Sequence, residues 1–142
     1  MLANRPRILS VGTSTPPNGY SQQDLIDLAK VEDPRIRALF TASHIERRYF
    51  YLPESTPEGL KEETQGELLE KHLKGGLEIG SQSVERCLEP LGLGPKDIDY
   101  LACITTTGFM APGFTAHLMK HMGFRQNCSR VDVVGMGCNA GL

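Results

Sequence analysis

A cysteine framed by glycines is the residue of this 142-residue chain best suited to chemistry. Cys138 follows Gly135-Met136-Gly137, which in turn follows an apolar run predicted to be a strand over residues 129–134. Glycines permit a tight turn that exposes the next side chain at the end of a sheet. If a helix begins at Cys138, its dipole and unpaired N–H groups would lower the thiol pKa below about 8.5 and make it a nucleophile. On spacing alone, a buried cysteine in a glycine-rich turn is the alternative.

The other cysteines and the histidines are weaker candidates. Cys87, Cys103 and Cys128 show no C-x-x-C pairing, so each is interpreted as a small, reduced, buried side chain. His117 and His121 have the spacing that could place two imidazoles on one zinc ion, and Cys128, nearby in the sequence, is a possible third ligand. No fourth ligand follows at a suitable spacing. We therefore expect no metal site, and a helix packed at a subunit interface instead.

Alternating strands and helices must position these residues. Short apolar runs predict strands over residues 6–12, 97–105 and 129–134, and helical spacing predicts helices over 21–30, after Pro34, over 65–88 and after Gly113. Glycines inside the helix over 65–88 each cost about 1 kcal/mol relative to alanine, which indicates the close approach of another backbone. The alternation favours a parallel or mixed sheet covered by helices on both faces, without an internal domain boundary.

Composition argues against several classes of function. Hydrophobic residues make up 39% of the chain and charged residues 23%, which is typical of a globular protein. The net charge of −2 argues against nucleic acid or an anionic membrane as a partner. No apolar run approaches the roughly 20 residues of a membrane span, and residues 1–7 lack the apolar core of a signal peptide. We therefore expect a cytoplasmic protein, and its end soon after Cys138 predicts a truncation just beyond the nucleophile.

Three segments together resemble the type III polyketide synthases, the chalcone synthase-like family. Residues 6–16 are similar to the opening strand and G-T-x-x-P turn of that family, and residues 43–52 to its S-x-I-x-x-R-Y segment. Residues 105–113 match its T-T-S/T-G-x-x-x-P-G loop, and the cysteine elbow follows at the family's spacing. Within the family, the elbow G-M-G-C-N-A-G resembles that of the bacterial 3,5-dihydroxyphenylacetyl-CoA synthases.

The resemblance implies a fold and an activity. The fold is α/β and thiolase-like, with residues 1–142 as the N-terminal domain of a five-layered αβαβα architecture. The activity is an acyltransferase that condenses malonyl-CoA units through a thioester on Cys138 to make a polyketide, 3,5-dihydroxyphenylacetyl-CoA. The implied protein is a homodimer that uses coenzyme A thioesters as substrates and has no cofactor. The family's oxyanion-hole His and Asn lie beyond residue 142, so we expect the 142-residue chain alone to be inactive.

The resemblance also implies substrate-binding residues. Thr106 and Thr107 match positions that line the initiation or elongation pocket, although their hydroxyls could instead cap the following turn. Plant chalcone synthases have a Met before the Pro-Gly pair that reaches into the partner's pocket. This chain has Ala111 there, which leaves Met110 as the candidate for that contribution.

Coenzyme A phosphates need cations, and Arg35 and Arg37 lie in the region where the family places basic residues. The positions do not match in full, because the family's lysine before the S-x-I segment is Ala42 here. Exposed arginines are more often solvated surface. Arg47 and Arg48 are interpreted as supporting the fold through ion pairs.

Two other functions are compatible with the sequence. An initiating ketoacyl-ACP synthase shares the fold and the nucleophile, but it would have an acyl-carrier partner and an Ala-Cys-Ala-like elbow in place of Gly-Cys-Asn. A truncated, non-catalytic fragment that folds only with a complementary half is the alternative from another class of protein.

Overall fold

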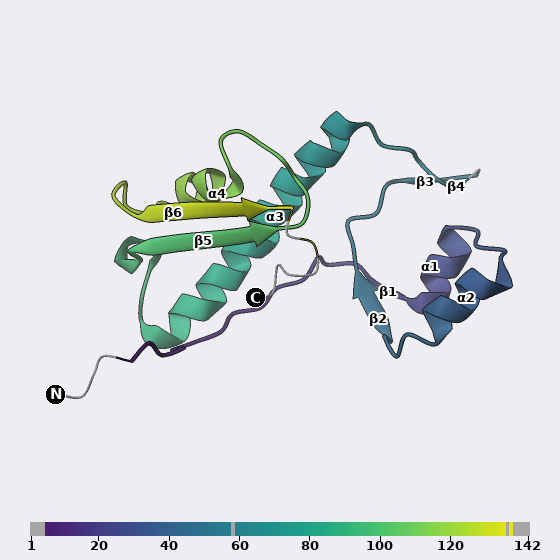
Figure 1. The fold of residues 1–142 in the computed structure, drawn as a ribbon, viewed down its shortest axis with the longest axis horizontal. Coiled ribbons are helices and arrows are strands. Elements are labelled where there is room, and N and C mark those ends of the chain that lie inside the picture. The colour runs from purple at the N-terminus through teal and green to yellow at the C-terminus, as the bar shows by residue number, and fades with distance from the viewer. Residues whose placement is uncertain (1–4, 58, 136, 138–142) are drawn as a thin grey trace. The chain divides into compact units, whose positions relative to one another are not determined.

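The computed structural model of the protein describes residues 5–57, 59–135 and 137. They form two compact units (Figure 1). The small unit contains residues 15–71, and the sheet unit contains the described residues before 15 and after 71. The glycine-rich elbow and the threonine-rich loop both belong to the sheet unit.

The small unit consists of two helices and two short antiparallel strand pairs. Its elements are β1 (Gly19–Ser21), α1 (Gln22–Leu28), α2 (Pro34–Thr41), β2 (Arg47–Tyr49), β3 (Ser55–Thr56) and β4 (Gly59–Leu60), with β1 paired to β2 and β3 to β4. Helix α1 begins where it was predicted because Ser21 and Asp24 form a capping box, in which each side chain accepts a hydrogen bond from the other's backbone N–H. It ends before the predicted Lys30, whose left-handed φ of 49° does not continue a helix.

The long helix α3 (Gln65–Leu88) has the predicted bounds. Thr64 and Glu67 cap its start reciprocally: the Glu67 carboxylate accepts from the Thr64 N–H, and the Thr64 hydroxyl accepts from the Glu67 N–H. The hydrogen bonds from Thr64 and the nearby Lys61 lower the pKa of Glu67 to about 2. Glu67 thus has a local structural role at the helix start. The helix gives way to the 3-10 turn Glu89–Leu91, which ends at Gly92 with a left-handed φ of 64°.

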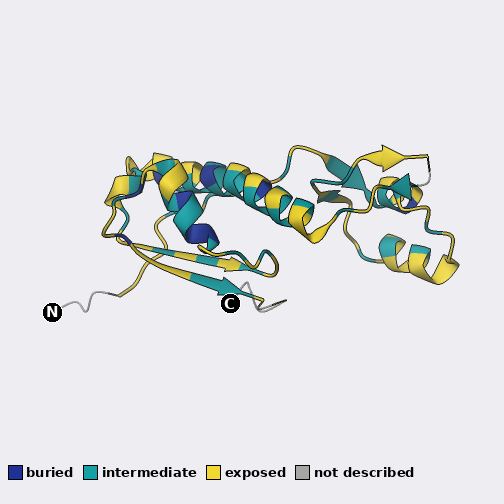
Figure 2. Ribbon diagram, turned by 90° about the horizontal axis from the view of Figure 1, so that it is seen from above, coloured by how far each residue is buried: buried dark blue, intermediate teal, exposed yellow. Residues whose placement is uncertain are grey.

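A parallel strand pair and a helix complete the sheet unit. Strand β5 (Tyr100–Thr105) pairs with β6 (Ser129–Val134), and α4 (Phe114–Met122) lies between them in the chain. The parallel pairing agrees with the predicted parallel or mixed sheet, and the bounds of β6 are confirmed, whereas β5 begins later than the predicted residue 97. Among the described residues, α3 and α4 lie on the same side of these strands (Figure 2). The expectation that helices cover both faces is therefore not met in the described part of the chain.

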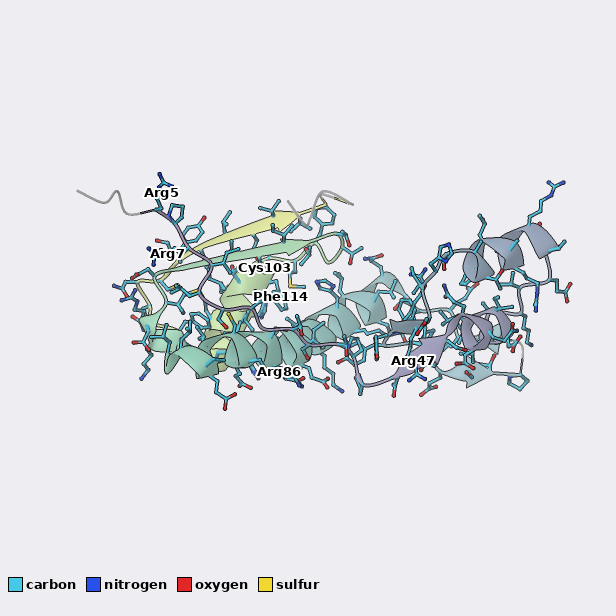
Figure 3. All side chains as sticks on the ribbon, turned by 90° about the horizontal axis from the view of Figure 1, so that it is seen from below. Arg5, Arg7, Arg47, Arg86, Cys103 and Phe114 are labelled. Carbon is cyan, nitrogen blue, oxygen red and sulfur yellow. The ribbon has the colours of Figure 1, made fainter. Side chains whose placement is uncertain are left out.

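Helices α3 and α4 pack through the glycines of α3. A β-carbon on Gly76 would lie 2.8 Å from the ring of Phe114, and one on Gly80 would contact Phe114 and Leu118 at about 3.6–3.7 Å. Phe114, which is labelled in Figure 3, is 8% exposed, and Leu118 is 4% exposed, so both are buried. Gly76 and Gly80 therefore make room for side chains of α4. The sequence predicted the close approach of another backbone, and at these two glycines the approaching atoms belong to side chains instead. None of the helices that the structure describes is long and apolar enough to cross a membrane.

The predicted strand over residues 6–12 is wrong for the described chain. The segment has no strand pairing, and Ile8, Leu9 and Val11 are 88%, 69% and 74% exposed. An apolar run becomes a strand when a neighbouring strand accepts its backbone hydrogen bonds, and β5 and β6 pair with each other in a two-stranded sheet.

Beyond this exposed stretch, the N-terminal segment lies against α3. The Ser14 hydroxyl donates to Gln82 Oε1 at 2.8 Å, and Arg86 Nη1 donates to the Thr13 carbonyl at 2.7 Å. At Gly12 the two backbones meet: a β-carbon there would lie 2.1 Å from the carbonyl oxygen of Ser83 and 2.5 Å from the amide nitrogen of Cys87. Glycine is required at this contact because helix backbone cannot move aside.

We predict that Gly12→Ala destabilises the protein by about 1–3 kcal/mol, the usual cost of overpacking. The matched control is Gly66→Ala in α3, where a β-carbon would meet nothing closer than 3.9 Å. That change should stabilise the helix by up to about 1 kcal/mol. Urea unfolding followed by circular dichroism measures both free energies. Equal effects of the two substitutions would contradict the close packing of Gly12.

Candidate functional site

The candidate site lies where β5 and β6 end. The parallel register pairs Thr105 with Val134, so both strands deliver the chain to the same edge of the sheet. The Gly135 N–H donates to the Thr105 carbonyl at 3.0 Å, which continues the pairing by one residue. Gly135 and Gly137 have left-handed φ values of 84° and 57°. These angles confirm the predicted need for glycine in the elbow, whereas Met136 and Cys138 lie outside the described residues.

The threonine-rich loop runs from the end of β5 to α4. Thr106 and Thr107 are exposed at its start, and Met110 is half-buried. Phe109, which sequence reasoning did not select, is the loop residue that approaches the elbow. A β-carbon on Gly135 would lie 3.4 Å from Cζ of Phe109, whose side chain is 74% exposed. The structure therefore brings Thr106 and Thr107 to the same sheet edge as the first residue of the elbow.

A carboxylate on β6 anchors the far end of this loop. Asp132 accepts hydrogen bonds from the backbone N–H of Thr115 at 2.8 Å and from its hydroxyl at 2.5 Å. Arg130 adds a hydrogen bond to the Thr115 hydroxyl at 3.1 Å and a contact to Asp132 at 3.4 Å. Thr115 is fully buried, so these bonds satisfy polar groups that water does not reach. A β-carbon on Gly113 would lie 2.4 Å from the Asp132 carboxylate, which explains the glycine.

Sequence reasoning missed Asp132 and Thr115. The available signal was Gly113 itself: a glycine before a helix has no side chain with which to cap the first N–H groups. A helix that starts in this way needs an acceptor from elsewhere. Asp132 is the one acidic residue in the run 129–134, but its distance from Gly113 in the sequence hid the pairing.

We predict that Asp132→Ala destabilises the complete protein by roughly 1–3 kcal/mol, because the Thr115 N–H and hydroxyl would remain buried without their acceptor. Asp97→Ala is the control, since Asp97 makes the similar bond to the Gly94 N–H at an exposed turn. Its effect should be smaller because water can replace the lost acceptor. Denaturant unfolding measures both, and an Asp132 effect no larger than that of Asp97 would contradict the anchoring role.

The three cysteines away from the elbow are free thiols. Cys128 is buried, and its Sγ lies 3.5 Å from the Ser129 carbonyl. Cys87 and Cys103 are half-buried, so the expectation of full burial holds for Cys128 and in part for the other two. Burial, and then the nearby Asp132 carboxylate, raise the pKa of the Cys103 thiol. A raised pKa makes Cys103 a poor nucleophile at neutral pH.

Cys103 should therefore react more slowly with iodoacetamide at pH 7.5 than a cysteine in an unstructured peptide. Its rate should keep rising at pH values where the peptide thiol is already ionised, because its thiolate forms at higher pH. Peptide mapping by mass spectrometry over a pH series measures the rate at this thiol. A rate equal to or above that of the peptide would contradict the effect of burial and Asp132.

The candidate coenzyme A residues lie in the small unit. Arg35 is exposed on α2, while Arg37 is half-buried and donates from Nη1 to the Val31 carbonyl at 2.9 Å. Arg48 donates from Nε to Gln22 Oε1 at 3.2 Å. Within the described chain Arg47 and Arg48 form no salt bridge, so the prediction that ion pairs involving them support the fold is not met there. Arg48 instead borders an apolar cavity of about 470 Å³ inside this unit.

Within the described ranges, no three His, Cys, Asp or Glu side chains gather in a way that could hold a metal ion. His117 is half-buried and His121 exposed on α4. Cys128, considered with them as a ligand, is turned to the carbonyl of its neighbour Ser129.

The strand edge, the threonine loop and the left-handed glycines lie within a stretch that matches one known family. Residues 3–142 match the family of chalcone and stilbene synthases, N-terminal domain, and the chain belongs to it. A 3,5-dihydroxyphenylacetyl-CoA synthase from Amycolatopsis orientalis is 45% identical over 96% of this chain. One from Streptomyces toyocaensis is 43% identical over 97% of it. The chain spans 37% and 36% of the length of these two relatives.

Solved structures share the fold. The type III polyketide synthase domain of Steely1 from Dictyostelium matches 94% of this chain with a TM-score of 0.79 and 26% identity, over 40% of its own chain. The fungal type III polyketide synthase ORAS matches 93% with a TM-score of 0.78 and 21% identity, over 37% of its chain. The chain thus has the α/β, thiolase-like fold of type III polyketide synthases.

Proposed function

We propose that the complete protein is an acyltransferase that condenses malonyl-CoA units into a polyketide, with 3,5-dihydroxyphenylacetyl-CoA as the product. The single observation that carries the proposal is the likeness to 3,5-dihydroxyphenylacetyl-CoA synthases over nearly the whole chain, at 43–45% identity. The geometry at the carboxyl ends of β5 and β6 supports it, since the elbow that precedes Cys138 starts beside the threonine loop.

The proposed chemistry begins at Cys138. Its thiolate attacks the carbonyl carbon of an acyl-CoA, a new thioester forms, and coenzyme A leaves as its thiol. A malonyl-CoA then loses carbon dioxide, and the resulting enolate carbon attacks the Cys138 thioester. The new carbon–carbon bond displaces the Cys138 thiolate and leaves a chain two carbons longer on coenzyme A. Each cycle is balanced without an oxidant, a reductant or a resident cofactor.

The other proposed roles follow from position. Thr106 and Thr107, with Met110 behind them in the loop, line the space in which the chain grows. Arg35 is the better of the two proposed phosphate ligands, because its side chain is exposed, whereas Arg37 is engaged by the Val31 carbonyl. We further propose that residues 1–142 are the N-terminal domain of a five-layered homodimer, and that this chain alone does not catalyse elongation.

We predict that acyl-CoA labels Cys138 in the complete protein and that Cys138→Ala abolishes polyketide formation. Cys103→Ala, at a thiol with a raised pKa, is the matched control and should retain the activity. Mass spectrometry of the acylated protein locates the thioester, and its appearance on Cys87, Cys103 or Cys128 would overturn the assignment. Iodoacetamide should also modify Cys138 faster than the other thiols near pH 7, because the helix that the sequence predicts to begin at Cys138 would favour the thiolate.

The substrate is tested separately. With malonyl-CoA as the sole carbon donor, the complete protein should form 3,5-dihydroxyphenylacetyl-CoA, identified by liquid chromatography and mass spectrometry. Turnover that requires malonyl attached to an acyl-carrier protein would instead identify a ketoacyl-ACP synthase. The 142-residue chain assayed in parallel should show no elongation.

A further inference from the structure

A half-buried histidine lies beneath the threonine loop. His72 is on α3, and its Nε2 is enclosed without a hydrogen-bond partner among the residues that the structure describes. The imidazole meets the ring of Phe114 edge-on, with 6.2 Å between centroids and 70° between planes. A buried polar atom without a hydrogen-bond partner destabilises the folded state. An apolar side chain of similar size would avoid that cost, so stability alone does not favour histidine at this position.

The imidazole of His72 packs directly against the loop at Gly108. Gly108 has a left-handed φ of 82°, and a β-carbon there would lie 2.3 Å from both Cδ2 and Nε2 of His72. Gly92 and Gly123 also have left-handed φ values, of 64° and 70°, but a β-carbon on either would meet nothing within 4 Å. Glycine is therefore required at position 108 for two reasons: its left-handed backbone angle, and the lack of space for a β-carbon beside His72.

Three contacts then hold the loop along its length. Its start is bound through the Thr105 carbonyl to the Gly135 N–H, and its end is bound at Thr115 to Asp132. His72 lies under the middle of the loop, next to Gly108. Gly108 directly follows Thr106 and Thr107 in the sequence. The first and last contacts are made by β6 and its continuation. The middle one is made by a separate element, α3.

We propose that His72 is a positioning residue, which supports the turn at Gly108 and thereby sets where Thr106 and Thr107 stand relative to the elbow. This inference rests on the proposed function, because Thr106 and Thr107 matter to the reaction as the lining of its pocket. Phe114 keeps the imidazole in place, so the packing of α4 on α3 contributes to the position of the loop.

A double-mutant cycle on thermal stability tests the contact without any assay of activity. In the complete protein, Gly108→Ala should lower the melting temperature, and the loss should shrink when His72→Ala removes the atoms that a β-carbon would strike. Gly123→Ala is the matched control, because it adds a β-carbon at a similar backbone angle in open space. Its loss should be the same with and without His72→Ala. Equal losses for Gly108→Ala in both backgrounds would overturn the contact.

Activity tests the positioning. His72→Ala in the complete protein should lower kcat for malonyl-CoA consumption by about 10- to 100-fold, the effect of displacing a substrate-positioning group by about 1 Å. It should also shift the products toward shorter, early-released chains, while acyl-CoA still labels Cys138 at the wild-type rate. His121→Ala on the exposed side of α4 should change neither. A folded His72→Ala protein with wild-type kcat and products would overturn the proposal.

Two further outcomes are distinguished: a His72→Ala protein that does not fold, and a wild-type protein that makes no polyketide. If His72→Ala does not fold, His72→Val removes the ring atoms that contact Gly108 but keeps an apolar side chain on α3. A changed product ratio with a folded protein then supports positioning, whereas an unchanged ratio overturns it. If the wild-type protein makes no polyketide from malonyl-CoA, the proposed function fails. The stability cycle between His72 and Gly108 still decides whether the imidazole supports the loop.

Discussion

The Asp132 carboxylate is the interaction on which the arrangement of the sheet unit depends. Helix α4 begins after a glycine, so no side chain at its N-cap can accept its first N–H groups. Asp132 accepts the Thr115 N–H and hydroxyl from a neighbouring strand and is itself approached by Arg130. Because Asp132 precedes the elbow on β6, one side chain links the helix, the threonine loop and the strand that leads to Cys138.

Glycines determine how closely these elements approach. Gly12 brings the N-terminal segment onto the backbone of α3, Gly76 admits the ring of Phe114, and Gly108 rests on His72. Each of these contacts involves α3, which lies on the same side of the strands as α4 (Figure 2). The opposite face of the strand pair exposes apolar side chains, among them Ile104 at 43% and Val131 at 37%. Among the residues that the structure describes, helices cover one face of this strand pair, and the other face carries these exposed apolar side chains.

Elements with strong local signals were predicted well. The bounds of α3 and β6 agree with the structure because a capping box, an apolar periodicity and turn residues all lie within the segment itself. The segment over residues 6–12 was not predicted correctly, because a strand exists through the hydrogen bonds of its neighbours. The end of α1 was placed too late, because the left-handed turn at Lys30 has no glycine or asparagine to mark it.

For the candidate site, the sequence by itself determined the parts: a glycine-framed cysteine, a threonine loop ending in Pro-Gly, and the family to which the chain belongs. These are local patterns whose meaning does not depend on distant residues. The tertiary structure decided which residues hold the parts together, namely Asp132 at the end of the loop and His72 beneath it. Both act across long separations in the chain, and contacts of that kind are formed by packing and leave no periodic signal in the sequence.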